Sequence, residues 1–315
     1  MTDSYVHTAA FMGTVVTFHV VGTGLRDSGA REDAVARAAD WFRCIEHACS
    51  RFDPASELRQ LSARTGVPTP VSAMLFEAIR FALAIAEETG GAFDPTVGAS
   101  VEAMGFDTDF RSGTVTQSDA SRRDADFRDV LLDTDARTVL LRRPLTFDLG
   151  AIAKGLAIDV AARELRAFEN FAIDAGGDLY LAGCNAEGRP WSIGIRHPHI
   201  AHETIETVHL SNKAICTSGD YERRSHRSAT DHHIVDGRSR ATATALASAT
   251  VVAESAMVAD AFATAAFILG PIEGLRLLER HGLDGLLISP ALDRFATAGM
   301  SALVSRSDAE SLRSA

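Results

Sequence analysis

Two segments far apart in the chain carry the residue types that bind phosphate and a hard cation. The first, residues 147–159, joins an apolar strand to a helix and supplies Asp148, Ala151 and Lys154. Free amides at a helix start and the helix dipole attract phosphate, and a lysine in the first turn adds a point charge. The Ala151 carbonyl is a ligand of the kind that hard cations prefer. The competing interpretation is an ordinary strand–turn–helix with Asp148 as a cap and Lys154 in solvent.

The second segment, residues 255–268, is almost wholly apolar apart from Asp260 and Thr264. Residues four apart share one helix face, so the two side chains project together. A buried carboxylate is costly unless it is paired or bound to a metal, and Mg²⁺ prefers oxygen ligands. We therefore interpret the pair as part of a magnesium shell. The alternative is an aspartate bonded to a nearby amide, with the threonine bonded back to its own helix.

Residues 89–98 form a glycine-containing segment that suits close approach to a ligand. Within it, Phe93 can stack on a ring and Asp94 can hold a base or a hydroxyl, unless the segment is only a helix cap followed by a turn. Met12 opens the first expected strand and can pack against a flat ring or simply into the core.

Two adjacent histidines, His232 and His233, lie beside acids in residues 231–236. Zinc binding is disfavoured because neighbours on a strand point to opposite faces. One histidine facing a cleft as a general base is the better interpretation, with an ordinary surface loop as the alternative.

Bulk composition limits the classes of partner. The 315 residues are 46% hydrophobic and 23% charged, with a formal charge of -11, which argues against nucleic acid or an anionic membrane as the main partner. The four cysteines form no CxxC pair, so we expect reduced thiols. No signal peptide, lipid-attachment cysteine or membrane span is recognised, and we expect a cytoplasmic protein.

Apolar periodicity predicts both helices and strands. We expect helices at 32–50, 72–89, 150–168, 255–268 and 271–281, a short capped helix after Ser56, and a final pair of elements near 294–304. We expect strands at 14–21, 129–133, 138–147, 171–174, 178–182, 191–196, 204–210, 214–217, 233–235 and 284–288. Because the two types do not alternate strictly, the fold class is α+β with mixed sheets and packed helices. We expect one region over 1–315, with two intimately packed lobes as the alternative arrangement, and a frayed tail at 305–315.

The order of the motifs resembles that of the ApbE-type FAD:protein FMN transferases. From residue 11 to residue 304 the chain reads, in turn, MGT, SRFDPASEL, TGGAFDPTVG, DLGAIAKGLAID, AGGDLYLAG, TSGDYE, HHIVD and ADAFATAAFILG. The resemblance implies the ApbE-like fold and Mg²⁺-dependent transfer of FMN from FAD to a threonine or serine of an acceptor protein, with release of AMP.

The resemblance also implies site residues. The residues that would line the FAD site are Met12, Phe52, Ala92, Phe93, Asp94, Asp148, Lys154, Ser218 and Ile234. The Ala151 carbonyl, Asp260 and Thr264 would hold Mg²⁺, and His233 would act as the base.

The chain departs from the family pattern at three places. Phe52 stands where a tyrosine is usual, and Ala263 where some members have a second metal-site aspartate. The segment 233–240 lacks the usual proline and Thr-Gly. Three alternatives stay open at this point: a Mg²⁺-dependent FAD pyrophosphatase that yields FMN and AMP, a non-catalytic FAD-binding or storage protein, and an α+β domain without flavin.

Overall fold

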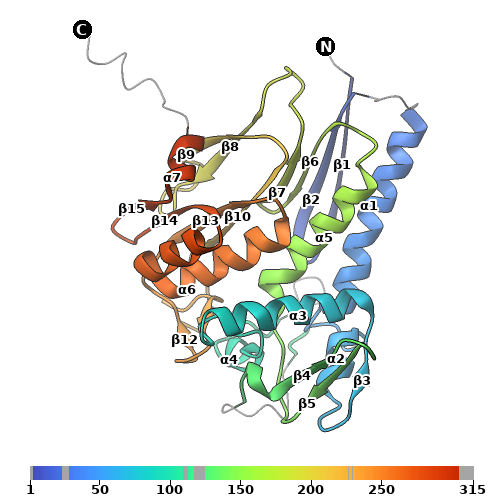
Figure 1. Ribbon diagram of the computed structural model, residues 1–315, viewed down its shortest axis with the longest axis vertical. Helices are drawn as coiled ribbons and strands as arrows, with labels where there is room; N and C mark the ends of the chain where they lie inside the picture. Colours follow the sequence, from blue (N-terminus) through green and yellow to red (C-terminus); the bar gives the residue numbers. More distant parts are fainter. Residues whose placement is uncertain are drawn as a thin grey trace.

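The computed structural model describes residues 3–22, 28–108, 113–116, 125–225, 227–228 and 230–304. Its centre is an eight-stranded antiparallel sheet with the order β1-β2-β6-β7-β10-β13-β14-β15 (Figure 1). The strands are β1 (Ser4–Phe11), β2 (Thr14–Val21), β6 (Asn170–Ala175), β7 (Asp178–Ala182), β10 (Lys213–Gly219), β13 (Ser248–Ala253), β14 (Asp284–Ile288) and β15 (Arg294–Ala296).

Three long helices, α1 (Ser28–Cys49), α5 (Gly150–Glu164) and α6 (Ala256–Arg280), pack on one face of this sheet (Figure 1). Alternation along the strands directs side chains to this layer, because successive residues of a strand point to opposite faces. On β10, for example, Ala214 and Cys216 join the helix-side core, whereas Ile215 belongs to the core on the other face. Trp41 of α1 donates from Nε1 to Oε1 of Glu164 at 3.0 Å, which ties α1 to the end of α5.

The opposite face of the sheet is covered by the hairpin of β8 (Trp191–Arg196) and β9 (Thr204–Leu210) and by the short helix α7 (Ala298–Leu303). Trp191 anchors this layer: it is 8% exposed and donates from Nε1 to the Ala182 carbonyl at 2.9 Å. The two tryptophans of the chain therefore lie in different layers.

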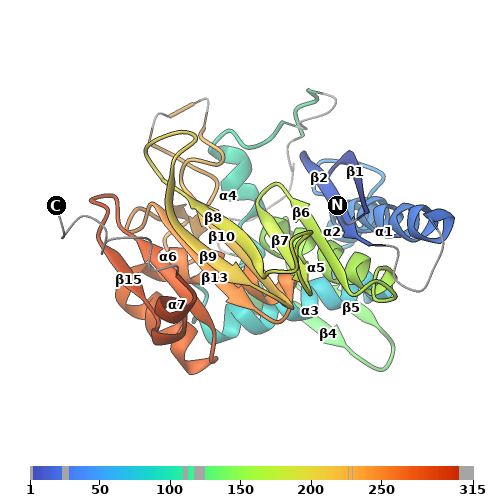
Figure 2. The ribbon, with the colours of Figure 1, turned by 90° about the horizontal axis from the view of Figure 1, so that it is seen from above.

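A smaller group of elements lies at one end of the helix layer, where α3 runs beneath α5 and α6 in the view of Figure 1. It contains a three-stranded sheet of order β3-β5-β4 and a two-stranded hairpin, β11-β12. Figure 2 shows β4 and β5 of the larger of these sheets beside α3. Its members are α2 (Glu57–Ser62), β3 (Thr69–Pro70), α3 (Ala73–Glu88), α4 (Gly98–Ala103), β4 (Val130–Asp133), β5 (Thr138–Leu141), β11 (Val235–Asp236) and β12 (Ala241–Thr242).

The expected α+β class is confirmed, with corrections at several elements. Residues 11–14 do not open the first strand; Met12 and Gly13 are the turn of a hairpin, at φ 51° and 74°, and the strand before them was missed. Helix α4 was also missed, and β5 ends at Leu141 rather than at 147. The expected break between two C-terminal helices is present, because Gly270 (φ 79°) precedes Pro271 inside α6. The expected tail at 305–315 lies outside the described residues.

Helix α6 is the one helix in the described ranges that is long and apolar enough to cross a membrane by length and composition alone. Its apolar window is 61% buried inside the fold, as is usual for a core helix. All four cysteines are unpaired, as expected.

Candidate functional site

The site is organised by the crossing of α5 and α6. Gly155 of α5 faces the first turn of α6 so closely that a Cβ atom there would lie 2.4 Å from the Ala256 carbonyl oxygen. One turn further along α5, the Asp159 carboxylate accepts hydrogen bonds from the Ser255 hydroxyl (2.6 Å) and from the amides of Ala256 (2.7 Å) and Met257 (3.0 Å). Asp159 therefore caps α6 from a neighbouring helix, and the cap fixes the register of the two helices.

Lys154 projects from the first turns of α5 into a pair of buried acids. Its ammonium contacts the Asp178 carboxylate and lies 3.4 Å from Oδ2 of Asp260, and each aspartate is only 4% exposed. Asp178 also accepts a hydrogen bond from the Thr217 amide at 3.4 Å. Burial by itself would lower the pKa of Lys154, but the two carboxylates outweigh it and the pKa is raised. The solvated lysine of the alternative interpretation is therefore not what the structure shows.

Asp260 is a buried acid that shares Lys154 with a second carboxylate. Burial is the main cause that raises its pKa to about 7, Asp178 adds to the effect, and Lys154 and the Gly155 amide oppose it. The amide of Gly155 lies 3.3 Å from Oδ2 of Asp260. In a regular helix the same amide faces the carbonyl of residue 151, so Asp260 meets α5 at the turn that carries the Ala151 carbonyl.

The oxygen atoms around Asp260 fit a hard cation better than a soft one. Thr264, one turn along α6, shares a 2.9 Å hydrogen bond with the hydroxyl of Ser218 on β10, rather than only bonding back to its own helix. Ala263 beside it is fully buried among apolar residues, and the second carboxylate of the cluster comes from Asp178 instead. The described residues contain no group of three or more His, Cys, Asp or Glu side chains suited to a metal. A carbonyl, a carboxylate and hydroxyls, completed by water and phosphate, are the ligands that Mg²⁺ accepts.

Asp148 lies just before α5 and is held by an arginine that the sequence analysis missed. Arg51 donates from Nε to Oδ2 of Asp148 at 3.0 Å, and the Gly150 amide donates to Oδ1 at 2.8 Å. Burial tends to raise the pKa of Asp148, but Arg51 and the Gly150 amide outweigh it and the pKa is lowered. The Arg51 guanidinium also lies 4.1 Å from the centroid of the Phe52 ring, so one side chain positions both residues.

The segment 89–98 packs inward. Ala92 is fully buried, Phe93 is 5% exposed, and Asp94 is 5% exposed. Oδ1 of Asp94 accepts from the amide (2.8 Å) and the hydroxyl (2.7 Å) of Thr96, while Oδ2 accepts from Arg240 at 3.2 Å. Burial is the main reason why the pKa of Asp94 is raised.

The hairpin turn at Met12 is tied to helix α1. The Met12 amide donates to Oε1 of Glu46 at 3.0 Å, and the Met12 side chain packs against the main core. The next residues of the hairpin approach the turn before β7, because a Cβ atom on Gly176 would lie 2.1 Å from the Thr14 hydroxyl. The Met12 turn is therefore adjacent to the turn that leads into Asp178.

The two adjacent histidines have different environments. His232 is 4% exposed; its Nε2 donates to the Ala243 carbonyl at 2.7 Å, and its Nδ1 accepts from the amide of the buried Ile234 at 3.3 Å. His233 points elsewhere, with Nδ1 3.4 Å from the Arg223 carbonyl and its ring edge-on to Phe106 at 6.2 Å. Burial, then the charge of Arg223, lowers the pKa of His233 to about 3, so this imidazole is neutral near pH 7. His233 and Asp148 also influence each other's pKa, which places them near one another.

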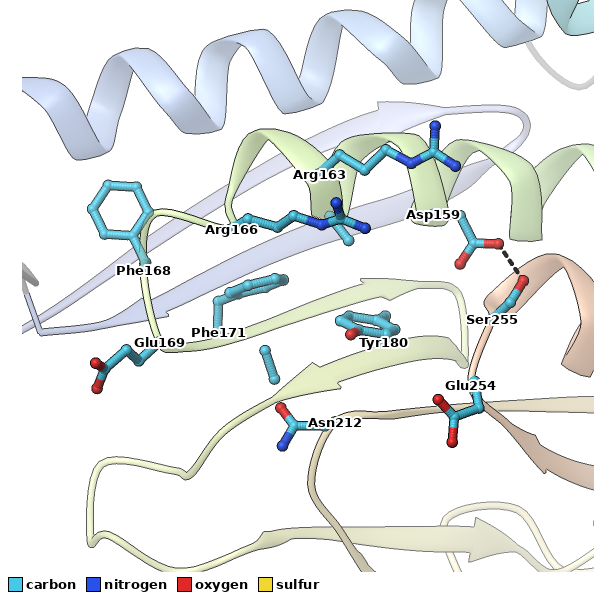
Figure 3. A pocket seen from close by; sticks show the side chains of 12 residues that line it. Asp159, Arg163, Arg166, Phe168, Glu169, Phe171, Tyr180, Asn212, Glu254 and Ser255 are labelled. Atoms are coloured by element: carbon cyan, nitrogen blue, oxygen red, sulfur yellow. Dashed lines mark hydrogen bonds between the residues drawn. The ribbon is translucent and has the colours of Figure 1, made fainter.

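Neither of the two best-defined pockets contains the cluster of Lys154, Asp178 and Asp260. A pocket of about 390 Å³ lies near the far end of α5, lined by residues that include Arg163, Arg166 and Tyr180, and it contains none of the expected site residues (Figure 3). The dashed bond between Asp159 and Ser255 in Figure 3 marks the helix cap, which closes one side of this pocket. A second pocket of about 230 Å³ contains Asp94 but not Lys154 or Asp260. The chemistry is therefore better identified by charge and contact than by volume.

Three residues of the assembled site were missed in the sequence. Asp178 follows Gly176-Gly177 directly at the start of β7, and this position after a glycine turn was the available signal. Arg51 precedes Phe52 within a motif that had been singled out. Arg240 reaches Asp94 across 146 positions, and no local pattern predicts that contact.

Comparisons with known proteins identify the family of the chain. The sequence model described as the ApbE family matches residues 12–287. A Haemophilus influenzae protein named FAD:protein FMN transferase is 32% identical over 269 residues, which cover 80% of this chain and 77% of that protein. The Treponema pallidum protein of the same name is 34% identical over 268 residues, covering 78% and 74%.

Solved structures give the same result for the fold. The ApbE protein from Thermotoga maritima matches with a TM-score of 0.84 at 27% identity, over 96% of this chain and 100% of that one. The flavin transferase ApbE from Vibrio cholerae matches with a TM-score of 0.83 at 25% identity, over 96% and 100%. The expected ApbE-like fold is therefore confirmed.

Proposed function

The chain belongs to the ApbE family, and on this premise we propose that it transfers FMN from FAD to a threonine or serine of an acceptor protein and releases AMP. One observation supports the proposal above all: Lys154, Asp178 and Asp260 form a buried charged cluster where α5 crosses α6. Such a cluster is costly in a structural core, and it suits the binding of a diphosphate and a cation.

The chain's own groups suit the diphosphate of FAD. The dipole of α5 favours an anion at the start of the helix, and Lys154 is a fixed cation because its pKa is raised. Asp148, held by Arg51 just before the helix, contributes acceptors that suit FAD hydroxyl or amide groups. The proposed lining of the FAD site is completed by Met12, Phe52, Ala92, Phe93, Asp94, Ser218 and Ile234.

Asp260, Thr264 and the Ala151 carbonyl would hold Mg²⁺. When bound there, the cation would neutralise charge that develops on the phosphates during transfer. A cation beside Asp260 would also favour the ionised carboxylate, whose pKa burial has raised to about 7.

His233 is the proposed acceptor of the proton. The hydroxyl oxygen of the incoming threonine or serine forms a bond to the phosphorus of the FMN half, and the phosphoanhydride bond breaks so that AMP leaves with the bridging oxygen. The hydroxyl proton passes to the neutral imidazole of His233. A bound diphosphate near His233 would raise its pKa from about 3 and so increase its strength as a base.

Mass spectrometry of a flavin-acceptor protein tests the proposal. The protein is incubated with FAD, Mg²⁺ and the acceptor, and we expect the acceptor to gain the mass of one FMN on a threonine or serine, with one AMP released per adduct. Free FMN and AMP formed equally fast without acceptor would indicate a pyrophosphatase instead. FAD that remains intact would indicate storage, and the absence of any FAD-induced thermal shift would rule out a flavin protein.

A further inference from the structure

We infer that Arg240 is a positioning residue, which holds the hairpin following His233 against residues 90–94 and thereby sets the FAD-binding geometry through Asp94. The inference rests on the proposed function, since it concerns the same site. Arg240 donates from one terminal nitrogen both to Oδ2 of Asp94 (3.2 Å) and to the Ala125 carbonyl (2.7 Å). It thus joins three segments that are distant in the sequence.

The backbone of Arg240 adopts an uncommon conformation. Its φ is 57°, a left-handed conformation that residues other than glycine, asparagine and aspartate rarely adopt. The Arg240 amide donates to the Asp236 carbonyl at 2.7 Å, which closes the turn of the hairpin. Glycine would fit this backbone conformation better than arginine, but glycine lacks the guanidinium that bonds to Asp94 and to the Ala125 carbonyl.

Gly237 makes the approach of the two segments possible. Its amide donates to the Ala92 carbonyl at 2.8 Å. A Cβ atom on Gly237 would lie 2.4 Å from the Asp94 Cβ and 2.4 Å from the Gly91 carbonyl oxygen. The tip of the hairpin therefore rests directly on the backbone of residues 91–94, and Arg240 closes the contact from the side.

The base of the same hairpin carries His233. The Ala243 amide donates to the Ile234 carbonyl at 3.1 Å, and the Ala243 carbonyl accepts from His232 at 2.7 Å. Val235 pairs with Thr242 between these bonds and the tip. A shift at the tip is therefore transmitted over a few residues to the proposed base.

Asp94 uses both carboxylate oxygens within the protein. Thr96 occupies Oδ1 and Arg240 occupies Oδ2, and the Asp94 side chain is 1% exposed. The two other arginines at the 230 Å³ pocket make local pairs: Arg128 with Asp126 at 2.8 Å, and Arg238 with Asp236 at 2.8 Å. Of these three arginines, only Arg240 forms a hydrogen bond between the hairpin and residues 90–94. Asp94 therefore acts on FAD through its position rather than through a free oxygen.

Arg240→Gly is the informative variant, because glycine accepts the positive φ while the whole arginine side chain, with its guanidinium, is lost. We expect kcat/KM for FAD to fall about tenfold to a hundredfold, as for the loss of a buried charged hydrogen bond, with a raised KM and a lowered kcat. Arg240→Lys should recover part of the loss. The matched control is Arg238→Ala, two residues away and paired only within the hairpin, which should stay within about twofold of the parent.

A double-mutant cycle with Asp94→Asn separates positioning from direct contact. If Asp94 acts through Arg240, the double variant loses no more than the worse single variant; additive losses in FAD affinity would overturn the inference. Arg240→Gly kinetics within twofold of the parent would also overturn it. A parent protein that leaves FAD intact would refute the proposed function instead. Hydrogen exchange at the Gly237 amide would then still test Arg240: faster exchange in Arg240→Gly than in Arg238→Ala supports its role, and equal exchange contradicts it.

Discussion

The two halves of the proposed site are held in place by different means. At the α5–α6 crossing, helix backbones touch at Gly155, and Asp159 caps the neighbouring helix with three hydrogen bonds. At the His233 hairpin, short strands and turns rest on residues 91–94 and are fixed by one arginine. The comparison teaches that the half proposed to bind the cation is part of the core, whereas the half that carries the proposed base is attached to the core through loops.

The two halves of the proposed site also differ in the charge state of their buried or partly buried side chains. The crossing buries opposite charges together, so that the pKa of Lys154 is raised by its two acids. His233 is partly buried beside Arg223 instead; desolvation and this positive charge lower its pKa to about 3 and keep it uncharged near pH 7. The positive charge of Lys154 is therefore held at the crossing, whereas His233 starts neutral and would gain a proton during the proposed reaction.

Removal of the Asp260 carboxylate is expected to have the largest effect on activity. Asp260→Ala should lower FAD turnover by about 10²–10³-fold or more, the size seen when one transition-state electrostatic contact is lost, while some FAD binding remains. HPLC of FAD, FMN and AMP over time gives the measurement. Glu254→Ala is the control, because this exposed acid pairs only with Lys213 at 2.7 Å and should leave turnover unchanged. Near-parental turnover in Asp260→Ala would remove Asp260 from the cation site.

A pair of glycine substitutions compares the two halves directly. Gly155→Ala and Gly237→Ala both place a Cβ atom 2.4 Å from backbone oxygen. In Gly155→Ala the clash lies between two core helices, so we expect a loss of about 1–3 kcal/mol in the free energy of unfolding. In Gly237→Ala a loop can give way, so we expect FAD turnover to fall with a smaller loss of stability. Urea denaturation and turnover of both variants test this, and equal losses of stability would contradict the distinction.

A pH dependence of stability is expected from His233. Because the folded pKa of about 3 lies below the unfolded value near 6.5, the unfolded state binds more protons between these limits. The contribution of His233 to stability should therefore rise from pH 3 to pH 6.5 and stay level above it. Urea denaturation at a series of pH values gives the free energy of unfolding of the parent and of His233→Gln. The plots of this free energy against pH should differ in slope only between pH 3 and pH 6.5. Parallel curves would show that His233 is not held neutral in the fold.

The sequence predicted the crossing well and the loops poorly, for physical reasons. Lys154 and Asp260 were found because each interrupts an apolar helical pattern, and a charge in such a place needs a partner. Strand β1 was missed because its turn, Met12-Gly13, lacks the Asn-Gly or Asp-Gly signal of a tight hairpin. Helix α4 has six residues and no side-chain cap, so little marks it locally. The Asp94–Arg240 pair joins residues 146 positions apart, and no local sequence pattern predicts such a contact.

The placement of the indole rings has an optical consequence. Trp41 joins α1 to α5 on one side of the sheet, and Trp191 secures the β8–β9 hairpin on the other. Each of these two layers thus carries a single tryptophan, and replacing either indole by phenylalanine leaves a tryptophan emission signal that reports on the remaining layer alone. Loosening of the layer that supports the charged crossing can in this way be followed separately from events on the opposite side.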